Sequence, residues 1–455
     1  MTTIASMITG AACRARPLLL AAVAAAVTVS SASFADDDKP GAEHGPNDKR
    51  ARNVILLIGD GMGDSEITTA RNYALGAAGR LALDTLPRTG AYTTYAIQET
   101  DPAKPDYVTD SAASGTAWAT GVKTSNGRIA TAAATDQDLT SILDLARQAG
   151  FRTGSVSTAD ITDATPAVLY AHVASRRCQG PADTVACPQD KKSAGGPGSI
   201  AEQAIDHAVD VLLGGGKRRF DQTIDGGPAA GQTVLQYATG RGYRIVTDAA
   251  GLAGAQPGQK LLGLFADGNM SVEWSGQAAL PAPGSGPQKC LENQRPANEP
   301  SLADMTRKAL ELLAQGGERG FFLQVEGASI DKRATVANAC EQIGETVAFD
   351  AAVKVALEFA EKHPDTLVVT TADHAHAGQI VPLYAAGPGL LTTLITADDA
   401  LMKISYGTAG PGASQTHTGT QVRVAAKGPQ AGRVVGVTDQ TDLFKTLKRA
   451  MDMDR

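Results

Sequence analysis

The stretch from Asn53 to Ser65 (NVILLIGDGMGDS) constrains the fold of this chain most strongly. Its first half is an unbroken apolar run, Val54 to Ile58, without helical spacing, which is typical of a strand buried on both faces. Asp60 follows between glycines, and in open α/β sheets ligands bind beyond the carboxyl ends of the strands. We therefore interpret Asp60 as a site residue. The alternatives are a dinucleotide-binding turn, which lacks its third glycine here, and an acid that only caps the next helix.

Helical and strand-like segments alternate along the rest of the chain. The predicted helices are Ser111 to Thr120, Leu139 to Ala149, Ser199 to Leu213, Leu302 to Gln315 and Ile343 to Lys362, and the predicted strands are Thr153 to Ser157, Phe321 to Val325 and Leu367 to Thr371. The Gly/Pro/Ser-rich stretches 189–198 and 280–300 are expected to be surface loops. This alternation predicts an α/β fold, with one large, mostly parallel central sheet and helices on both faces, in a single domain spanning 53–455.

The first 35 residues have the pattern of an export signal. Arg14 and Arg16 precede an apolar run from Leu18 to Val27, and small residues occupy the cleavage positions before Asp36. That run is shorter than the roughly 20 residues of a spanning helix, which favours a cleaved signal peptide (1–35) over a membrane anchor. The charged, turn-rich segment 36–52 is expected to be a flexible N-terminal arm.

Four cysteines remain once the signal is removed: Cys178, Cys187, Cys290 and Cys340. An even count in an exported chain predicts disulfides, and four cysteines allow three pairings. Local loop closure favours the Cys178–Cys187 and Cys290–Cys340 pairs. The alternative is a zinc cluster of thiolates, but the chain has no C-x-x-C pair.

The chain is acidic, with a formal net charge of −7 and no block of basic residues. This composition weighs against nucleic-acid binding, and an anionic substrate must therefore be attracted by local positive charge. Arg176 and Arg177 could offer a planar fork to a phosphate group, although a surface pair of arginines is the ordinary alternative.

Acids and histidines gather at the ends of predicted strands and in the polar turns that follow. They are Asp60, Glu326, Asp331, Asp373, His374, His376 and His417. Mixed carboxylate and imidazole ligands suit zinc, whereas an all-oxygen set suits magnesium. The pattern therefore predicts divalent metal ions, which would also relieve the repulsion between clustered carboxylates.

Ser111, in the string Asp110-Ser111-Ala112-Ala113-Ser114, is the candidate nucleophile. It opens a predicted helix, where free backbone N–H groups and the helix dipole favour an oxyanion or a phosphate. No histidine or acid triad surrounds it in sequence, so activation by a metal ion is expected. The alternative is that Ser111 only caps the helix.

These residues lie in strings that resemble the alkaline phosphatases, and the resemblance runs from about Arg52 to the C-terminal helix. The strings include LLIGDGMGDSE, PDYVTDSAAS, LLGLFADGNM, QVEGASIDK, TADHAHA and TDQTDLF. The resemblance implies a periplasmic phosphomonoesterase that releases inorganic phosphate from small phosphate monoesters. It further implies a homodimer, with two zinc ions and one magnesium ion per chain and no binding to nucleic acid or membrane.

The same resemblance assigns a role to each site residue. Ser111 would be the nucleophile that becomes a phosphoserine, Arg176 would clamp the phosphate oxygens, and Lys332 would assist phosphate binding through water. The implied first-zinc ligands are Asp331 and His417; the second-zinc ligands are Asp60, Asp373 and His374; and the magnesium residues are Asp60, Asp163, Thr165 and Glu326.

One position departs from the family pattern, in which the first-zinc aspartate is followed four residues later by a histidine ligand. Thr335 occupies that position here, and a neutral hydroxyl is a poor zinc ligand. Asp331 and His417 alone would fall short of the usual three protein ligands, so weak zinc affinity is expected. His376 is the candidate substitute ligand, or else the partner that orients Asp331.

Two other functions remain open at the level of sequence. A phosphodiesterase of the same superfamily could share the two-zinc core, and Thr335 could mark an impaired relative that only binds phosphate or metal. A sulfatase would need C/S-x-P-x-R, whereas Ser111 is followed by neither the proline nor the arginine.

Overall fold

A sheet of ten strands forms the centre of the described chain, which comprises residues 49–387 and 389–453 of the computed structural model. The strand order is β18-β2-β17-β13-β1-β12-β5-β6-β8-β7. The strands are β1 (Asn53–Gly59), β2 (Arg88–Thr93), β5 (Arg152–Asp160), β6 (Val211–Gly215), β7 (Tyr243–Val246), β8 (Lys260–Leu264), β12 (Phe321–Gly327), β13 (Thr366–Ala372), β17 (Val422–Lys427) and β18 (Gly436–Asp439). Neighbours pair in parallel except where β17 lies antiparallel between β13 and β2, which confirms the predicted α/β fold.

Strand β1 lies inside this sheet, between β12 and β13. All seven of its residues are buried, and Val54 to Ile58 are 0% exposed. This is the environment that an unbroken apolar run requires, because both faces of a parallel strand are covered by helices.

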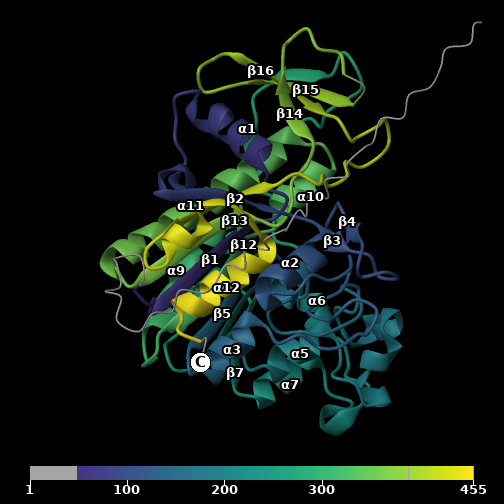
Figure 1. The fold of residues 1–455 in the computed structure, drawn as a ribbon, viewed down its shortest axis with the longest axis vertical. Helices are drawn as coiled ribbons and strands as arrows, with labels where there is room; N and C mark the ends of the chain where they lie inside the picture. Colours follow the sequence, from purple (N-terminus) through teal and green to yellow (C-terminus); the bar gives the residue numbers. More distant parts are fainter. Residues whose placement is uncertain (1–48, 388, 454–455) are drawn as a thin grey trace, which may run out of the picture. The chain divides into compact units, whose positions relative to one another are not determined.

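Helices cover both faces of the sheet (Figure 1). They are α1 (Asp64–Leu75), α2 (Ser111–Thr120), α3 (Ile142–Gln148), α4 (Ala164–Ala167), α5 (Ile200–Asp206), α6 (Lys217–Phe220), α7 (Val234–Gly240), α8 (Ala249–Ala253), α9 (Leu302–Ala314), α10 (Ser329–Thr335), α11 (Ala339–Lys362) and α12 (Gln440–Ala450). Alternate side chains of β12 show the two layers. Phe321 stacks edge-on against Phe359 of α11, whereas Gln324 points to the other face and accepts a hydrogen bond from Trp118 of α2.

Smaller sheets lie beside the central one. They are the four-stranded sheet β10 (Ser285–Gln288), β15 (Leu390–Ile395), β16 (Leu401–Tyr406) and β14 (Gly378–Val381), and the two-stranded pairs β11 (Leu291–Glu292) with β9 (Trp274–Ser275) and β3 (Ala96–Ile97) with β4 (Pro105–Asp106). The 3₁₀ turns are η1 (Ala82–Thr85), η2 (Pro181–Ala186), η3 (Pro188–Asp190), η4 (Lys192–Ala194), η5 (Gly227–Ala229) and η6 (Ala431–Val434). Stretch 280–300 therefore contains two short strands, so its prediction as loop alone is wrong.

The predicted helix from Ser199 to Leu213 is wrong in its second half. The capping box of Ser199 and Glu202 does open a helix, but α5 ends at Asp206. Ala208 then takes a positive φ of 53°, which breaks the helical path. The apolar run that follows forms β6, because it pairs in parallel with both β5 and β8. Sequence periodicity could not separate a short buried strand from a helical turn here.

The other predicted elements form with small changes at their ends. The prediction for α2 matches its bounds, and α11 begins four residues earlier than expected because the side chain of Asn338 accepts a hydrogen bond from Glu341 N and caps it. The predicted disulfides are confirmed, with Cα–Cα distances of 6.3 Å for Cys178–Cys187 and 5.2 Å for Cys290–Cys340.

The predicted signal peptide and most of the predicted arm lie outside the described residues. Ala51, at the start of the described chain, is buried and donates its N–H to the carbonyl of Ala450. Among the helices of residues 49–387 and 389–453, none combines the length and the apolar character that crossing a membrane demands.

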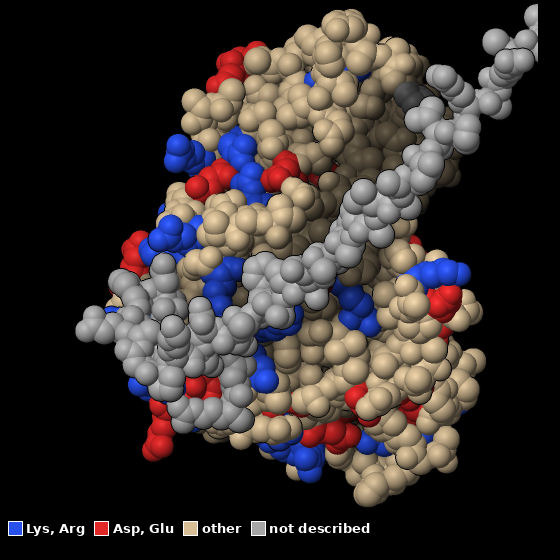
Figure 2. Space-filling model, viewed as in Figure 1, with Lys and Arg blue, Asp and Glu red and all other residues tan. Residues whose placement is uncertain are grey.

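Charged side chains of both signs are interspersed on the face of the described chain seen in Figure 2. Ion pairs contribute to this mixing; Arg71 and Arg423, for example, both contact Asp84, at 2.7 and 3.0 Å. The described residues visible on this face form no broad field of one sign (Figure 2).

We expect Leu56→Ala to lower the free energy of unfolding by about 2–5 kcal/mol, because Leu56 is fully buried in β1 and its truncation leaves a cavity. Denaturation in guanidinium chloride, followed by circular dichroism, measures this change. Leu291→Ala is the matched control: Leu291 is 68% exposed, so its change should stay within about 0.5 kcal/mol. Equal effects of the two substitutions would contradict the central place of β1.

Candidate active site

The ends of three adjacent strands bring the candidate acids together. Gly59 of β1 is in register with Gly327 of β12 and with Ala372 of β13. Since these strands are parallel, the residues at or just beyond their carboxyl ends meet at one edge of the sheet. Asp60, Glu326 and Asp373 consequently converge there, and all three are at least 96% buried.

Asp60, Asp373 and His374 form a first group that could hold a metal ion, with ligand atoms that all lie within 4.8 Å of one another. His374 Nε2 lies 3.4 Å from Asp60 Oδ1 and 3.3 Å from Asp373 Oδ2. Asp373 is 0% exposed and its Oδ2 accepts no hydrogen bond. A buried carboxylate oxygen without a donor is a poor arrangement for the protein alone, and a cation between these groups would satisfy it.

Ser111 lies against this first group. Its Oγ is 3.5 Å from Asp60 Oδ1 and 3.4 Å from His374 Nε2. Asp110, and not Ser111, caps α2: Asp110 Oδ1 accepts a hydrogen bond from Ala113 N. The interpretation of Ser111 as a helix cap is therefore wrong, and its hydroxyl instead faces Asp60 and His374.

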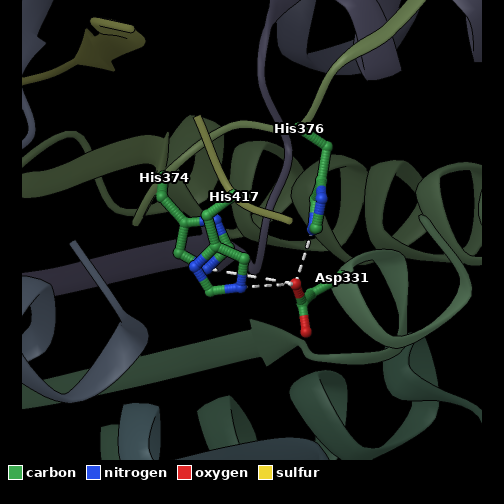
Figure 3. Close-up of side chains that lie close together, drawn as sticks. All are labelled: Asp331, His374, His376 and His417. Carbon is green, nitrogen blue, oxygen red and sulfur yellow. Dashed lines mark hydrogen bonds and ion pairs between the residues drawn. The ribbon is translucent and has the colours of Figure 1, made fainter. Parts of the chain in front are cut away.

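Asp331, His374, His376 and His417 form a second group, with three imidazole rings around one carboxylate (Figure 3). Asp331 Oδ1 lies 2.6 Å from His376 Nε2, 3.4 Å from His417 Nε2 and 4.0 Å from His374 Nε2. The rings of His374 and His417 stack, with centroids 3.5 Å apart. Nitrogen and carboxylate donors in this number are the set that zinc prefers.

The acids repel one another while they hold no cation. Burial, reinforced by the charges of Asp373 and Asp331, raises the pKa of Asp60 to about 8. Burial and the charge of Asp60 likewise raise the pKa of Glu326 well above its ordinary value. Burial lowers the pKa of His417, but the Asp331 carboxylate outweighs this effect and brings that pKa to about 9. The donor set therefore fits divalent cations, which would stabilise the ionised carboxylates.

Positive charge borders the acids on the side of α2. Arg176 Nη1 lies 3.1 Å from Asp110 Oδ2, and its Nη2 lies 2.9 Å from Asp163 Oδ1. Lys332 Nζ lies 2.7 Å from the other oxygen of Asp163. Although burial opposes its ionisation, Lys332 and Arg176 hold the pKa of Asp163 below its ordinary value. Two cations therefore border the acids of the site, and the contact of Arg176 with Asp110 ties one of them to the residue before Ser111.

The residues predicted to hold magnesium are near one another in the fold, but each interacts with different partners. Asp163 pairs with Arg176 and Lys332, and Glu326 accepts a hydrogen bond from Ser157 Oγ. Thr165 is buried in α4, and its carbonyl accepts a hydrogen bond from Gln324 Nε2. A third metal site at these residues stays a prediction.

Sequence reasoning missed the role of Asp110. One of its oxygens caps α2 and the other binds Arg176, so a single carboxylate links the helix of Ser111 to the cation beside it. An acid directly before a helix is a known capping signal, but the contact with Arg176, 66 residues away, is not visible in sequence. Arg177, the other arginine of the predicted pair, is exposed and lies outside this network in the described chain.

Comparison with known proteins gives consistent results. A family model described as alkaline phosphatase matches residues 51–409 and 393–453 of this chain. A streptomycin-6-phosphate phosphatase of Streptomyces griseus is 55% identical over 411 residues, covering 89% of this chain and 91% of the relative. An alkaline phosphatase of Escherichia coli is 53% identical over 420 residues, covering 90% of this chain and 87% of the relative.

Solved structures show the same fold. The alkaline phosphatase of Thermus thermophilus has a TM-score of 0.67 and 23% identity, covering 90% of this chain and 93% of that one. The alkaline phosphatase of the Antarctic bacterium TAB5 also has a TM-score of 0.67, with 24% identity and coverage of 90% and 100%.

We expect the metal-free chain to lose stability as the pH rises. A carboxyl group whose pKa is raised on folding stabilises the fold below its unfolded pKa, and that contribution is lost as the pH rises through the folded value. For Asp60 these values are 3.8 and about 8. The gain in Tm on adding a divalent cation should therefore be larger at about pH 8.5 than at about pH 5.

Asp60→Asn is the control for this experiment, because it removes the charge that titrates. Thermal unfolding of the metal-free variant should depend less on pH over the same interval. A pH dependence as steep as that of the unmodified chain would contradict the role of Asp60.

Proposed function

Since this chain belongs to the alkaline phosphatase family, whose members hydrolyse phosphate monoesters and depend on metal ions, we propose that its reaction passes through a phosphoserine on Ser111. We further propose that two zinc ions (Zn²⁺) and one magnesium ion (Mg²⁺) assist the reaction. The observation that carries the proposal is the position of Ser111 Oγ, within 3.5 Å of both Asp60 Oδ1 and His374 Nε2 at the first residue of α2.

Ser111 has two features of a nucleophile for phosphoryl transfer. Its hydroxyl faces a group of metal-capable side chains, and it stands at a helix N-terminus whose free N–H groups favour an anionic phosphate. The Ser111 Oγ–phosphorus bond forms as the ester bond breaks, and the alcohol leaves. Water then cleaves the phosphoserine and releases inorganic phosphate, so the enzyme returns to its starting state.

Arg176 and Lys332 would bind the phosphate. A guanidinium group can donate two parallel hydrogen bonds to phosphate oxygens, and Lys332 adds a point charge from α10. The contacts of Arg176 with Asp110 and Asp163 hold its side chain in place before substrate arrives. This preorganisation reduces the entropy cost of binding the phosphate dianion.

The two zinc assignments draw on the two groups of metal-capable side chains, and the magnesium assignment follows the resemblance to the family. Asp331 and His417 would hold the first zinc ion; Asp60, Asp373 and His374 the second; and Asp60, Asp163, Thr165 and Glu326 the magnesium ion with its waters. When bound, these cations would stabilise charge on the attacking and departing oxygens and lower the pKa of the Ser111 hydroxyl. The unpaired Asp373 Oδ2 and the raised pKa of Asp60 support cation binding at this site.

We also propose that the mature protein is a periplasmic homodimer that acts on small phosphate monoesters. The pattern of an export signal in 1–35 and the two disulfides of the described chain support an oxidising compartment.

Ser111→Ala should abolish the phosphoenzyme, because no other hydroxyl in the described chain occupies its position beside Asp60 and His374. Acid quenching after exposure to a ³²P-labelled monoester measures the protein-bound label. Ser114→Ala is the matched control three residues along the same helix; Ser114 Oγ donates to the carbonyl of Asp373, so this variant should retain the label. Undiminished labelling of the Ser111 variant would refute the proposed intermediate.

Arg176→Ala should lower kcat/KM for an aryl phosphate at least about tenfold, because each lost hydrogen bond to a charged group costs about 1.5–3 kcal/mol. Steady-state kinetics with p-nitrophenyl phosphate measures the change. Arg177→Ala is the matched control, since Arg177 is exposed, and it should stay within about twofold. A similar loss in both variants would show that general positive charge, rather than the Arg176 fork, binds the substrate.

A further inference from the structure

Helix α10 supplies Asp331 to the second group of metal-capable side chains, but it supplies no histidine. Asp331 and Thr335 are four residues apart on α10, so their side chains share a face of that helix. The carbonyl of Thr335 accepts a hydrogen bond from Gln415 N, which places Thr335 beside the segment that carries His417. Thr335 thus lies at the site, but its side chain offers only a neutral hydroxyl, which is a poor ligand for zinc.

His376 is placed where it could supply the missing nitrogen. Its Nε2 shares a hydrogen bond with Asp331 Oδ1 at 2.6 Å, which a metal ion between the two groups would replace, whereas the Nε2 of His417 lies 3.4 Å from the same oxygen (Figure 3). The ring stands nearly perpendicular to that of His417, with an interplanar angle of 81°. The two rings also lie on different sides of Asp331 (Figure 3), and the ligands of a tetrahedral ion likewise surround the ion from different sides.

The backbone fixes the ring of His376. The side chain of His376 is 0% exposed. Gly61 has a φ of 65°, and a Cβ atom there would lie 2.8 Å from His376 Cδ2 and 3.0 Å from the Cβ of Asp331. The turn after β1 therefore closes directly over both side chains, so His376 Nε2 is held towards the site.

We propose that His376 is a direct ligand of the metal ion held by Asp331 and His417, and takes the place that Thr335 leaves open. The proposal rests on the metal assignments of the proposed function. It gives the first site three protein ligands, two imidazoles and one carboxylate, which is the usual set of a catalytic zinc ion. His374 remains with Asp60 and Asp373 in the neighbouring group.

Glu66 of α1 is the positioning residue for this ligand. A metal-binding histidine usually donates its other ring N–H to a carboxylate or a carbonyl group. His376 Nδ1 is buried and has no hydrogen-bond partner, so an acceptor must come from its surroundings. Glu66 is 3% exposed and lies beside the turn that carries His376, because a Cβ atom at Gly63 would lie 2.5 Å from the Cβ of Ala375 and 2.9 Å from Glu66 Oε2.

The carboxylate of Glu66 lies close to two glycines and accepts a hydrogen bond from Ser65 Oγ at 2.8 Å. Cβ atoms at Gly63 and at Gly378 would lie 2.9 Å from its Oε2 and 3.2 Å from its Oε1. Gly378 is two residues beyond His376, so the same turn that carries the ligand encloses the acid. In the proposed arrangement Glu66 would accept the Nδ1–H of a metal-bound His376.

A cycle of four proteins tests the proposal: the unmodified chain, His376→Ala, Thr335→His and the double variant. Competition with a chromophoric chelator measures zinc affinity, without reference to turnover. We expect His376→Ala to weaken the first site more than about 100-fold, beyond the range of a residue that only orients a ligand. In the His376→Ala background, Thr335→His should raise zinc affinity at least about tenfold. In the unmodified chain, the same substitution should change zinc affinity less than about threefold.

If Thr335→His tightens zinc binding by the same factor in both backgrounds, His376 does not bind the metal and only orients Asp331. Cadmium-113 NMR of the fully loaded protein provides a second readout, since each bound ion gives its own resonance. His376→Gln, which keeps a polar side chain of similar length, should shift one resonance and leave the other in place. Unshifted resonances would also overturn the proposal.

Glu66→Gln tests the positioning role. It should weaken zinc binding about 10–100-fold in the unmodified chain and have no further effect once His376 is alanine. Glu358→Gln, an exposed acid on α11, is the matched control and should change nothing. If Glu66→Gln weakens zinc binding equally in the unmodified chain and in the His376→Ala variant, Glu66 does not position His376. Because the readout is metal binding, a failure of the phosphoserine assay would refute the proposed reaction while leaving this ligand assignment standing.

Discussion

Burial of like charges at one edge of a parallel sheet is the constraint on which the rest of the site depends. Three neighbouring strands end in register, so the acids at their ends are forced together whether or not their charges repel. Burial then removes the water that would otherwise screen them, and the pKa of Asp60 rises to about 8. Such an arrangement is unfavourable for the protein alone. Its electrostatic cost is offset when a divalent cation binds, so metal affinity and fold stability are coupled here.

Unlike the clustered acids, the basic groups of the site each have a partner of opposite charge. Arg176 and Lys332 are each paired with Asp163, and Arg176 also contacts Asp110. These ion pairs neutralise the local charge while they hold the basic groups near Ser111. Since Asp110 also caps α2, the same residue positions the helix that begins at Ser111 and the guanidinium group of Arg176.

Individual residues show how far sequence reasoning reached. Asp60, Glu326 and Asp373 were predictable as neighbours, because strand ends of a parallel sheet share an edge. The network of Asp110 was not, since its partner Arg176 is distant in sequence. The second half of the segment after Ser199 was misassigned as helix, because a five-residue apolar run is ambiguous until its neighbours in the sheet are known. Likewise, the strands within 280–300 depend on pairing with β15 and β9, which no local pattern encodes.

The sequence by itself determined the class of fold, the family and the identity of the groups available for chemistry. Buried strands need continuous apolar runs, and metal sites need particular donor atoms, so both leave local marks. Only the tertiary structure decided which histidine nitrogens lie around Asp331 Oδ1 and how the turn at Gly61 closes over His376. Distances between side chains from different strands and turns are set by register and packing, and these arise only when the whole sheet has formed.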